Sequence, residues 1–339
     1  MLRPVQAVIV AGGLGTRLRP LTFNRPKALV PLLNRPQILR ILDQLPSSVD
    51  EVFVAVNYMY ERVRDALRET PLGRTVTVVD EPTPLGTAGA VKSLESRLQG
   101  TFAVYNGDVI DSMSLTEFLA FHRKHRALAT VALYEVDDPS PFGVVAMEGS
   151  RITRFVEKPP RAEAPSHLVN AGRYVFEPDV LDEIPKGIPV SMERDLFPNL
   201  AKDRLHGFPF TGYWSDAGTL SGYINATSIL LANGGAAVGS GAKVAHATLD
   251  GAVLVPDGCV VSGRIGPNVA MGPRCRVDDG TVSNSVLLEG ASIEAGGVVS
   301  GSVIGEDSSV GPGAVVEDSI IGDGVRVGKG RRVIQERMA

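Results

Sequence analysis

The stretch AVIVAGGLGTRLRP, residues 7–20, joins the apolar run Ala7 to Val10 directly to a glycine-rich loop. An unbroken apolar run of this kind is typical of a strand that is covered on both faces of a parallel sheet. Ligands on such sheets bind beyond the carboxyl ends of the strands. The loop that follows Val10 is therefore the first place where we expect a binding site.

Apolar runs alternate with amphipathic stretches up to about residue 228. This alternation predicts βαβ units and an α/β domain with a three-layer, mostly parallel, Rossmann-like sheet. We expect strands over residues 5–10, 51–56, 75–79, 102–105 and 129–134, and helices over 38–45, 60–68, 89–98 and 115–125.

Later in the chain, glycine and valine dominate and apolar residues recur every sixth position. The sets that begin at Leu287, Ile304 and Ile321 start 17 residues apart, and each set has three apolar positions six residues apart, one for each side of a triangular coil. This pattern predicts a left-handed parallel β-helix, and we place the domains at 1–232 and 233–339. The series is Ile265, Met271, Val277, Leu287, Ile293, Val299, Ile304, Val310, Val316, Ile321, Val327 and Val333.

Composition excludes several classes of protein. The 34 basic and 38 acidic residues give a net charge of −4, so no basic excess can hold a nucleic acid. No apolar run approaches the roughly 20 residues that span a bilayer, and no separate signal peptide precedes the first strand. With only Cys259 and Cys275, the chain fits a reducing cytoplasm. Because stacked coils leave open faces, we expect a homo-oligomer, a dimer or a tetramer.

Two basic residues accompany the glycine-rich loop. Gly12, Gly13 and Gly15 leave backbone amides free to close around oxyanions, and Arg17 adds planar donors. Lys27 follows between two prolines that stiffen the chain. These residues favour a phosphate ligand. A plain strand-to-helix turn and a solvated surface lysine are the alternative interpretations.

Acidic residues at two later loops could hold a cation. Asp108 directly follows the apolar run 102–105, and Asp216 lies in the segment YWSDAG, residues 213–218. Mg²⁺ typically takes one or two carboxylates together with phosphate oxygens, which two such aspartates would supply. Taken singly, each could instead be a turn or capping residue.

A third group of polar residues suits a sugar phosphate. Glu157 could accept hydrogen bonds from vicinal hydroxyls while Lys158 meets a phosphate. Asn170 offers an amide, and Gly143 and Gly172 allow a close approach of the backbone. A pair of solvated charges and two simple bends are the alternatives.

Taken in order, these segments resemble the sugar-1-phosphate nucleotidyltransferase family. FVEKP, VNY at 56–58 and SMERDLFPNLA at 191–201 are most similar to its mannose-1-phosphate guanylyltransferase branch, although Gly107 stands where that branch usually has serine. The motifs that carry the resemblance are GGLGTRLRPLT at 12–22, RPKALVPL at 25–32, PLGTAGAV at 84–91, NGD at 106–108, FVEKP at 155–159, NAG at 170–172 and DAG at 216–218.

The resemblance implies Mg²⁺-dependent transfer of a nucleotidyl group from a nucleoside triphosphate to a hexose 1-phosphate, with release of pyrophosphate. It implies Arg17 and Lys27 as catalytic residues and Asp108 with Asp216 as metal ligands. The implied nucleotide-binding residues are Ala11, Gly12, Gly13, Glu81, Gly86 and Asp108, and the implied sugar-phosphate residues are Gly143, Glu157, Lys158, Asn170 and Gly172.

Glu81 bears on the base. Thymidylyl and uridylyl relatives have glutamine there, whose amide both donates and accepts, whereas a carboxylate only accepts. Guanine presents two neighbouring N–H donors, so Glu81 favours GTP, and with mannose 1-phosphate the product would be GDP-mannose. A glucose-1-phosphate thymidylyl- or uridylyltransferase is the alternative, with Glu81 in a plain acidic turn.

Two further alternatives concern the whole chain. A non-catalytic regulatory subunit that binds sugar nucleotides would be expected to lack one of Arg17, Lys27, Asp108 and Asp216, and all are present. An acyltransferase activity of the β-helix commonly needs a histidine base, and His246 is the only histidine from residue 237 onward. We therefore interpret the β-helix as an assembly and packing module.

Overall fold

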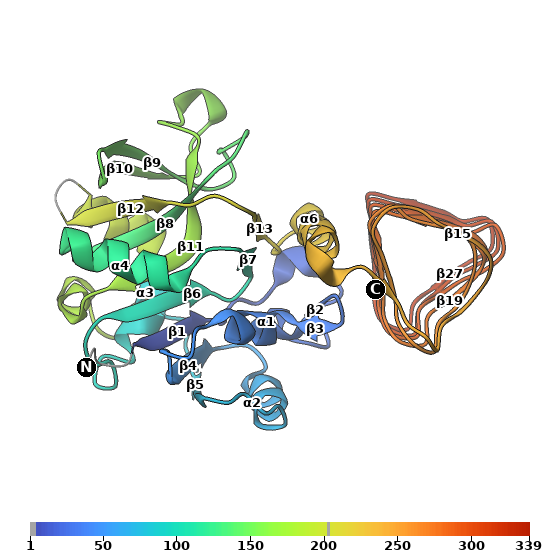
Figure 1. Cartoon of the computed structure of the whole chain (residues 1–339), viewed down its shortest axis with the longest axis horizontal. Coiled ribbons are helices and arrows are strands. Elements are labelled where there is room, and N and C mark those ends of the chain that lie inside the picture. Colours follow the sequence, from blue (N-terminus) through green and yellow to red (C-terminus); the bar gives the residue numbers. More distant parts are fainter. Residues whose placement is uncertain (1–4, 202–203) are drawn as a thin grey trace. The chain divides into compact units, whose positions relative to one another are not determined.

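The computed structural model describes residues 5–201 and 204–339. The chain forms two compact units, which differ from a simple division of the sequence (Figure 1). The sheet unit consists of Met1–Gly13 and Ile38–Trp214. The coil unit consists of Leu14–Gln37 and Ser215–Ala339, so the segment 14–37 packs with the C-terminal part of the chain.

A nine-stranded sheet forms the centre of the sheet unit (Figure 1). Its first four strands are parallel, with Val8 of β1 opposite Phe53 of β4 and Val104 of β6. Beyond β6 the sheet is mixed, because β11 runs antiparallel to both of its neighbours. In sheet order the strands are β5 (Thr75–Asp80), β4 (Glu51–Val56), β1 (Gln6–Val10), β6 (Phe102–Asn106), β11 (Leu168–Phe176), β8 (Ala129–Glu135), β12 (Leu205–Pro209), β10 (Arg151–Glu157) and β9 (Gly143–Glu148).

All four predicted helices are present: two have the predicted bounds, the one expected over 38–45 lies one residue earlier, and one is displaced further. The helix expected over 89–98 is α3, which begins at Gly86 and ends at Lys92. After Lys92 the chain continues as tight turns, in which Glu95 N–H bonds the Lys92 carbonyl. The helices are α1 (Gln37–Gln44), α2 (Tyr60–Arg68), α3, α4 (Leu115–His125), α5 (Phe197–Leu200), α6 (Leu220–Leu230), the 3₁₀ helices η1 (Thr16–Leu18), η2 (Lys27–Leu29), η3 (Arg161–Glu163) and η4 (Pro178–Glu183), and the π-helical turns η5 (Met192–Leu196) and η6 (Leu231–Gly235). The short strands outside the large sheets are β2 (Pro31–Leu32), β3 (Arg35–Pro36), β7 (Val109–Asp111) and β13 (Trp214–Asp216).

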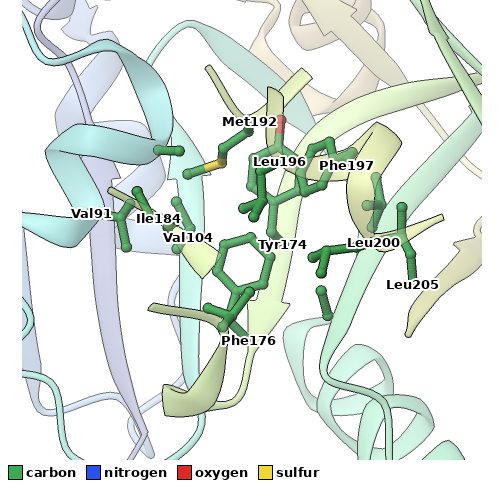
Figure 2. Packing of buried hydrophobic residues seen from close by; sticks show 14 of the residues in the cluster. Val91, Val104, Tyr174, Phe176, Ile184, Met192, Leu196, Phe197, Leu200 and Leu205 are labelled. Atoms are coloured by element: carbon green, nitrogen blue, oxygen red, sulfur yellow. The ribbon is translucent and has the colours of Figure 1, made fainter. Parts of the chain in front are cut away.

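Both faces of the sheet are buried, as the unbroken apolar runs predict. Val8 and Ile9 point to opposite faces of β1 and are both fully buried. On the Val8 face, helix α3 and the segment of η5 and α5 complete one apolar cluster. Figure 2 shows Tyr174 of β11 among Met192, Leu196 and Phe197 from that segment. The sheet is therefore the middle of three layers, and its loops are the exposed parts that a ligand can reach.

The C-terminal part of the coil unit is a parallel β-helix with a triangular outline (Figure 1). All twelve residues of the predicted hexad series are buried, and successive coils pair Leu287 with Ile304 and Ile304 with Ile321. One face of the helix is β14 (Ala237–Val238), β16 (Val253–Val255), β18 (Val269–Met271), β20 (Ser285–Leu287), β23 (Val303–Ile304), β26 (Ile320–Ile321) and β29 (Arg337–Met338). The other faces are β15 (Lys243–Leu249), β17 (Val260–Ile265), β19 (Arg276–Ser283), β21 (Ser292–Ile293), β22 (Val298–Ser300), β24 (Ser309–Val310), β25 (Val315–Glu317), β27 (Arg326–Val327) and β28 (Arg332–Ile334).

Glycines at the corners of the coils have a steric reason. A Cβ on Gly305 would lie 2.5 Å from the carbonyl carbon of Gly322, its counterpart in the next coil. A side chain there would push adjacent coils apart and break their ladder. In residues 5–201 and 204–339, no helix is both long and apolar enough to cross a bilayer.

Candidate active site

The loops after the parallel strands of the sheet unit gather at one edge of the sheet. Ala11 N–H donates to the Ala55 carbonyl of β4 at 2.9 Å, and Gly107 N–H donates to the Val10 carbonyl at 3.0 Å. A Cβ on Gly107 would lie 3.2 Å from the Ala11 Cβ. This crowding favours glycine at position 107.

Gly12 lies against the loop that follows β5. A Cβ on Gly12 would be 3.2 Å from Glu81 Oε2 and 3.4 Å from the Asn57 Cβ, whereas the space around Gly13 is open. Asn57 Nδ2 donates to the Glu81 carbonyl and ties the β4 and β5 loops together. Gly12 thus lets the β1 loop approach Glu81, and Gly13 leaves room for a ligand.

Glu81 is buried, and its two carboxylate oxygens have different surroundings. Oε1 accepts the Leu85 N–H at 2.7 Å, which closes the turn before α3. Oε2 faces Gly12. Burial raises the pKa of this carboxyl above its ordinary value, and the Leu85 hydrogen bond lowers the pKa by less. The acidic turn that sequence offered as an alternative is therefore present, with one oxygen directed away from it.

Gly86 is required by a close approach of another segment. Its φ of +72° lies in the left-handed region, and a Cβ would be 2.6 Å from the Val190 carbonyl oxygen. That oxygen accepts N–H bonds from Ala88 and Gly89 in the first turn of α3. Gly86 thus allows the start of α3 to approach the backbone at Val190 and fixes the end of the Glu81 loop.

Asp108 lies in a turn whose backbone carbonyls are hydrogen-bonded by a buried arginine. The Arg173 guanidinium donates to the carbonyls of Asn106 at 2.9 Å and Val109 at 2.7 Å, on either side of Asp108. Its Nε lies 2.8 Å from Asp111 Oδ2, and both side chains are buried. The turn is therefore fixed by groups that a ligand cannot reach, while Asp108 remains half-buried.

The expected sugar-phosphate residues of β9 and β10 lie together. Glu157 pairs with Gly143 across the two strands, and a Cβ on Gly143 would be 3.0 Å from Glu157 Oε2. Lys158 Nζ is exposed and lies 3.5 Å from Glu157 Oε1. Burial raises the pKa of Glu157, and Lys158 opposes this shift. The Glu157 carboxylate, which can accept hydrogen bonds, therefore lies beside the exposed ammonium group of Lys158.

Asn170 and Gly172 belong to a polar network that includes a buried tyrosine. Asn170 Oδ1 accepts the Gly172 N–H at 2.9 Å, and its Nδ2 donates to the Tyr174 hydroxyl at 3.0 Å. The Tyr174 hydroxyl donates to Glu193 Oε1 at 3.4 Å (its ring is seen in Figure 2). Glu193 also accepts from Thr87 Oγ1 at 3.0 Å. The network orients the Asn170 amide and brings a second carboxylate to the surroundings of Glu157.

In the coil unit, three predicted residues that are far apart in the sequence meet around Gly218. A Cβ on Gly218 would lie 2.5 Å from Lys27 Nζ and 2.8 Å from Arg17 Nη2. Its N–H donates to Asp216 Oδ1 at 2.7 Å, and Arg17 Nη2 is 3.9 Å from Asp216 Oδ2. Two cations and a carboxylate therefore surround one bare stretch of backbone, which suits a phosphate with a bound cation.

Lys27 is not the solvated lysine that its sequence context allows. Lys27 is buried, with 9% of the residue exposed, whereas the Arg17 side chain is 54% exposed. The left-handed Gly15 and the Thr22 hydroxyl, which donates to the Gly15 carbonyl at 2.9 Å, shape the loop around it. A buried ammonium group next to an exposed guanidinium is well placed to neutralise an incoming anion.

Within the described part of the chain, no three His, Cys, Asp or Glu side chains group closely enough to hold a metal by themselves. Asp108 lies in the sheet unit and Asp216 in the coil unit. Carboxylate oxygens are the donor type that Mg²⁺ prefers, and such an ion keeps several positions for water and substrate phosphate. Aspartates with these donors are chemically compatible with a substrate-bound cation.

Comparison with known families identifies the family of this chain. The nucleotidyl transferase family profile matches residues 6–233, and the profile of the GMPPB C-terminal domain matches residues 238–338. This chain belongs to the nucleotidyl transferase family. The match covers every residue that sequence analysis placed in a site.

Relatives of this nucleotidyl transferase are similar over most of their length. It is 35% identical over 304 residues to a mannose-1-phosphate guanylyltransferase of Mycobacterium tuberculosis, over 86% of this chain and 82% of that protein. It is 38% identical over 306 residues to mannose-1-phosphate guanylyltransferase 1 of Arabidopsis thaliana, over 86% of this chain and 83% of that protein.

Solved structures support the same fold. A putative glucose-1-phosphate thymidylyltransferase from Bacillus anthracis superimposes with a TM-score of 0.60 at 24% identity, over 66% of this chain and 94% of that chain. HddC from Yersinia pseudotuberculosis, solved with GMP-PN, superimposes with a TM-score of 0.58 at 25% identity, over 67% of this chain and 99% of that chain.

Three residues of the candidate site were not among the predicted ones. Gly218 and Glu193 lie inside motifs that support the resemblance, DAG and SMERD, so their neighbours in sequence signalled them. Arg173 follows NAG directly, but nothing in its sequence context distinguishes a buried arginine that bonds backbone carbonyls from an exposed arginine on a strand. Its role depends on carbonyls some 65 residues earlier in the chain.

Proposed function

We propose that this chain transfers a guanylyl group from GTP to mannose 1-phosphate and releases pyrophosphate, with GDP-mannose as the product. The observation that carries this proposal is the meeting of Arg17, Lys27 and Asp216 around Gly218. The names of the relatives in Mycobacterium tuberculosis and Arabidopsis thaliana support the choice of sugar and base.

The reaction joins two anions. A phosphate oxygen of mannose 1-phosphate attacks the α-phosphorus of GTP, and the bond from that phosphorus to the oxygen that bridges to the β-phosphate breaks as pyrophosphate leaves. Catalysis of this kind depends on positioning and on neutralising charge. In the proposal, Arg17 and Lys27 hold the triphosphate, and Lys27 stabilises the charge that develops during transfer.

The family generally uses a divalent metal, and we propose Mg²⁺ here with Asp108 and Asp216 as its protein ligands. When bound, the ion would neutralise phosphate oxygens and favour the departure of pyrophosphate. The support from the structure is chemical: both aspartates have oxygen donors, and Arg173 fixes the turn that carries Asp108. Asp216 is fixed by the Gly218 N–H.

The sugar phosphate and the base are assigned to the sheet unit. We propose that Glu157 and Asn170 bind mannose hydroxyls, between the close approaches allowed by Gly143 and Gly172, and that Lys158 meets the sugar phosphate. We propose that Ala11, Gly12, Gly13 and Gly86 enclose the nucleotide. Glu81 would accept hydrogen bonds from guanine through Oε2, the oxygen that does not bond Leu85.

We also propose that the chain forms a homo-oligomer, a dimer or a tetramer, through faces that the β-helix leaves open. The mass of the purified protein, measured by light scattering during gel filtration, tests this. A single species with the mass of one chain at micromolar concentration would refute it.

Pyrophosphate release with Mg²⁺ tests the activity. The panel pairs GTP, ATP, UTP and dTTP with mannose 1-phosphate and with glucose 1-phosphate. We expect GTP with mannose 1-phosphate to be fastest and both Asp108→Asn and Asp216→Asn to abolish turnover while the proteins remain folded. Preference for dTTP or UTP with glucose 1-phosphate would favour the thymidylyl- or uridylyltransferase alternative. Binding without turnover for every pair would favour a regulatory subunit.

A further inference from the structure

The segment 14–37 of the coil unit carries Arg17 on η1 and Lys27 on η2, and it is attached to the β-helix by an ion-pair cluster. The Arg25 guanidinium lies 2.5 Å from Glu306 Oε1 through Nη1 and 2.6 Å from Asp323 Oδ2 through Nη2. The side chains of Arg25 and Asp323 are 12% and 17% exposed, so this pair is largely shielded from water, whereas Glu306 is 42% exposed at the edge of the cluster. Shielded, charge-assisted hydrogen bonds of this type are stronger than surface ion pairs.

The two acidic residues belong to adjacent coils and are themselves ordered. Glu306 and Asp323 occupy equivalent corners 17 residues apart, and Asp323 Oδ1 accepts the Glu306 N–H at 2.9 Å. The carboxylates therefore form a preorganised receptor for one guanidinium. Neither residue is part of the reaction as proposed, and the packing of the β-helix core does not require them.

Other contacts attach the same segment at both of its ends. Asn34 Nδ2 donates to the Met271 carbonyl of β18 at 2.9 Å. Arg337 Nη1 lies 3.4 Å from the carbonyl oxygen of Thr16, next to Arg17. A Cβ on Gly322 would lie 3.0 Å from the Pro20 Cγ, so the coil corner must stay bare for the segment to approach.

We propose that Arg25, Glu306 and Asp323 position Lys27 and Arg17 for catalysis, so that the β-helix is a working part of the transfer reaction rather than only a packing module. This rests on the proposed function, in which those two cations hold the triphosphate. Arg25 stands two residues before Lys27 and is a positioning residue, because it acts through the loop. A shift of about 1 Å in a reacting group can lower a rate roughly 100-fold.

The test changes the β-helix alone. Glu306→Gln with Asp323→Asn removes both charges but keeps the shapes and the acceptor for the Glu306 N–H. We expect kcat to fall about 10- to 100-fold while KM for mannose 1-phosphate stays within about twofold. Arg25→Lys, which keeps the charge but not the fork, is expected to retain more activity than Arg25→Met.

The matched control is Glu289→Gln, which breaks the exposed Arg274–Glu289 pair between two other coils of the same β-helix. It should leave kcat unchanged. Hydrogen exchange gives a readout without catalysis: peptides covering residues 14–37 should exchange faster in the Glu306→Gln, Asp323→Asn protein, whereas peptides of β4 should not.

Unchanged kcat together with unchanged exchange in the Glu306→Gln, Asp323→Asn protein would overturn the proposal, even if Arg25→Met were inactive or failed to fold. Faster exchange with unchanged kcat would also overturn it, because the attachment would then be structural only. If the wild-type chain turned over none of the tested substrate pairs, the proposed function would fail first, and the exchange experiment would still decide whether the cluster orders the segment.

Discussion

Arg173 and Asp111 form an ion pair in the interior of the sheet unit, with 2.8 Å between Nε and Oδ2 and exposures of 1% and 4%. The same guanidinium lies over the Tyr105 ring, 4.6 Å from its centroid. It also holds the carbonyls that flank Asp108. A costly buried charge is thus used to fix the geometry of a turn that carries a proposed metal ligand.

Arg173→Met should therefore cost both stability and activity. It leaves the Asp111 carboxylate buried without its cation, for which a loss of about 3–5 kcal/mol is expected. Adding Asp111→Asn should restore part of the stability, because the amide is neutral and still accepts the Met113 N–H. Activity should stay low in the double variant, since the carbonyls at Asn106 and Val109 still lack their donor. Urea unfolding and kcat measure the two effects.

Arg74→Met is the matched control for that experiment. Arg74 also donates to backbone carbonyls of the sheet unit, those of Leu45 and Val49, but away from the candidate site. It should lose stability and keep its kcat. If Arg173→Met and the double variant kept wild-type kcat, Arg173 would have no role in placing Asp108.

Gly218→Ala tests the cation cluster of the coil unit. The new methyl would lie 2.5 Å from Lys27 Nζ and 2.8 Å from Arg17 Nη2, which are the far ends of flexible side chains. They can move away, so we expect a stability change within about 1 kcal/mol but a fall in kcat/KM of roughly 10-fold or more. Gly328→Ala, in the same unit with open space around it, should change neither quantity. Equal kcat/KM values for the two variants would contradict the proposed role of the cluster.

Glu81→Gln tests how the base is read. The amide can still accept the Leu85 N–H, so the turn should persist. The amide NH₂ of the new glutamine can donate a hydrogen bond to a pyrimidine carbonyl. The side chain no longer offers a carboxylate to the N–H groups of guanine. We expect kcat/KM for GTP to fall at least about 10-fold and the ratio of UTP to GTP turnover to rise. An unchanged nucleotide preference would show that other groups select the base.

The same variant has a pH signature. Burial raises the pKa of Glu81, so the folded state holds this proton more tightly than the unfolded state. The ionised carboxyl therefore costs stability, and the cost appears as the pH rises above about 4, the ordinary pKa of glutamate. Glu81→Gln should gain stability relative to wild type between about pH 4 and 7, with little gain below pH 4. Urea midpoints that differ by a constant amount across this range would refute it.

Sequence periodicity predicted the strands, helices and coils well, because the spacing of buried residues along an element follows from the local geometry of that element. The strand over 51–56 and the helices over 60–68 and 115–125 have the predicted bounds, and each hexad residue of the β-helix is buried. Periodicity could not show that β11 turns the sheet antiparallel, since strand direction depends on connections rather than on the strand itself.

The candidate site shows the same limit more strongly. Motifs located Arg17, Lys27 and Asp216, but a linear sequence does not show that they meet at Gly218. Arg25 lies within a quoted motif, and its partners lie about 280 and 300 residues later. Contacts of this kind depend on side-chain geometry that no local pattern encodes.

The β-helix contains one further regularity, a buried serine every 17 residues at Ser285, Ser302 and Ser319. Ser302 N–H donates to Ser285 Oγ at 3.1 Å, and Ser319 N–H donates to Ser302 Oγ at 3.0 Å. Ser302 Oγ in turn donates to the Ser300 carbonyl at 2.7 Å. The hydroxyls thus satisfy backbone groups at a corner where the strand ladder is interrupted.

Ser302→Ala should therefore destabilise the β-helix more than the removal of a hydroxyl from a serine on the surface would. It leaves the buried Ser319 N–H without its acceptor, for an expected cost of about 1–3 kcal/mol, whereas the Ser300 carbonyl keeps its bond from the Asp318 N–H. Ser309→Ala is the control, because no hydrogen bond of the Ser309 hydroxyl is found in residues 5–201 and 204–339, and its cost should stay below about 0.5 kcal/mol. Equal urea midpoints for the two variants would mean that the ladder contributes nothing. Ser302 lies outside the cluster that attaches segment 14–37, so the kcat of the Ser302→Ala protein at 25 °C should match that of wild type. This result would separate the stability of the coils from the positioning assigned to Arg25.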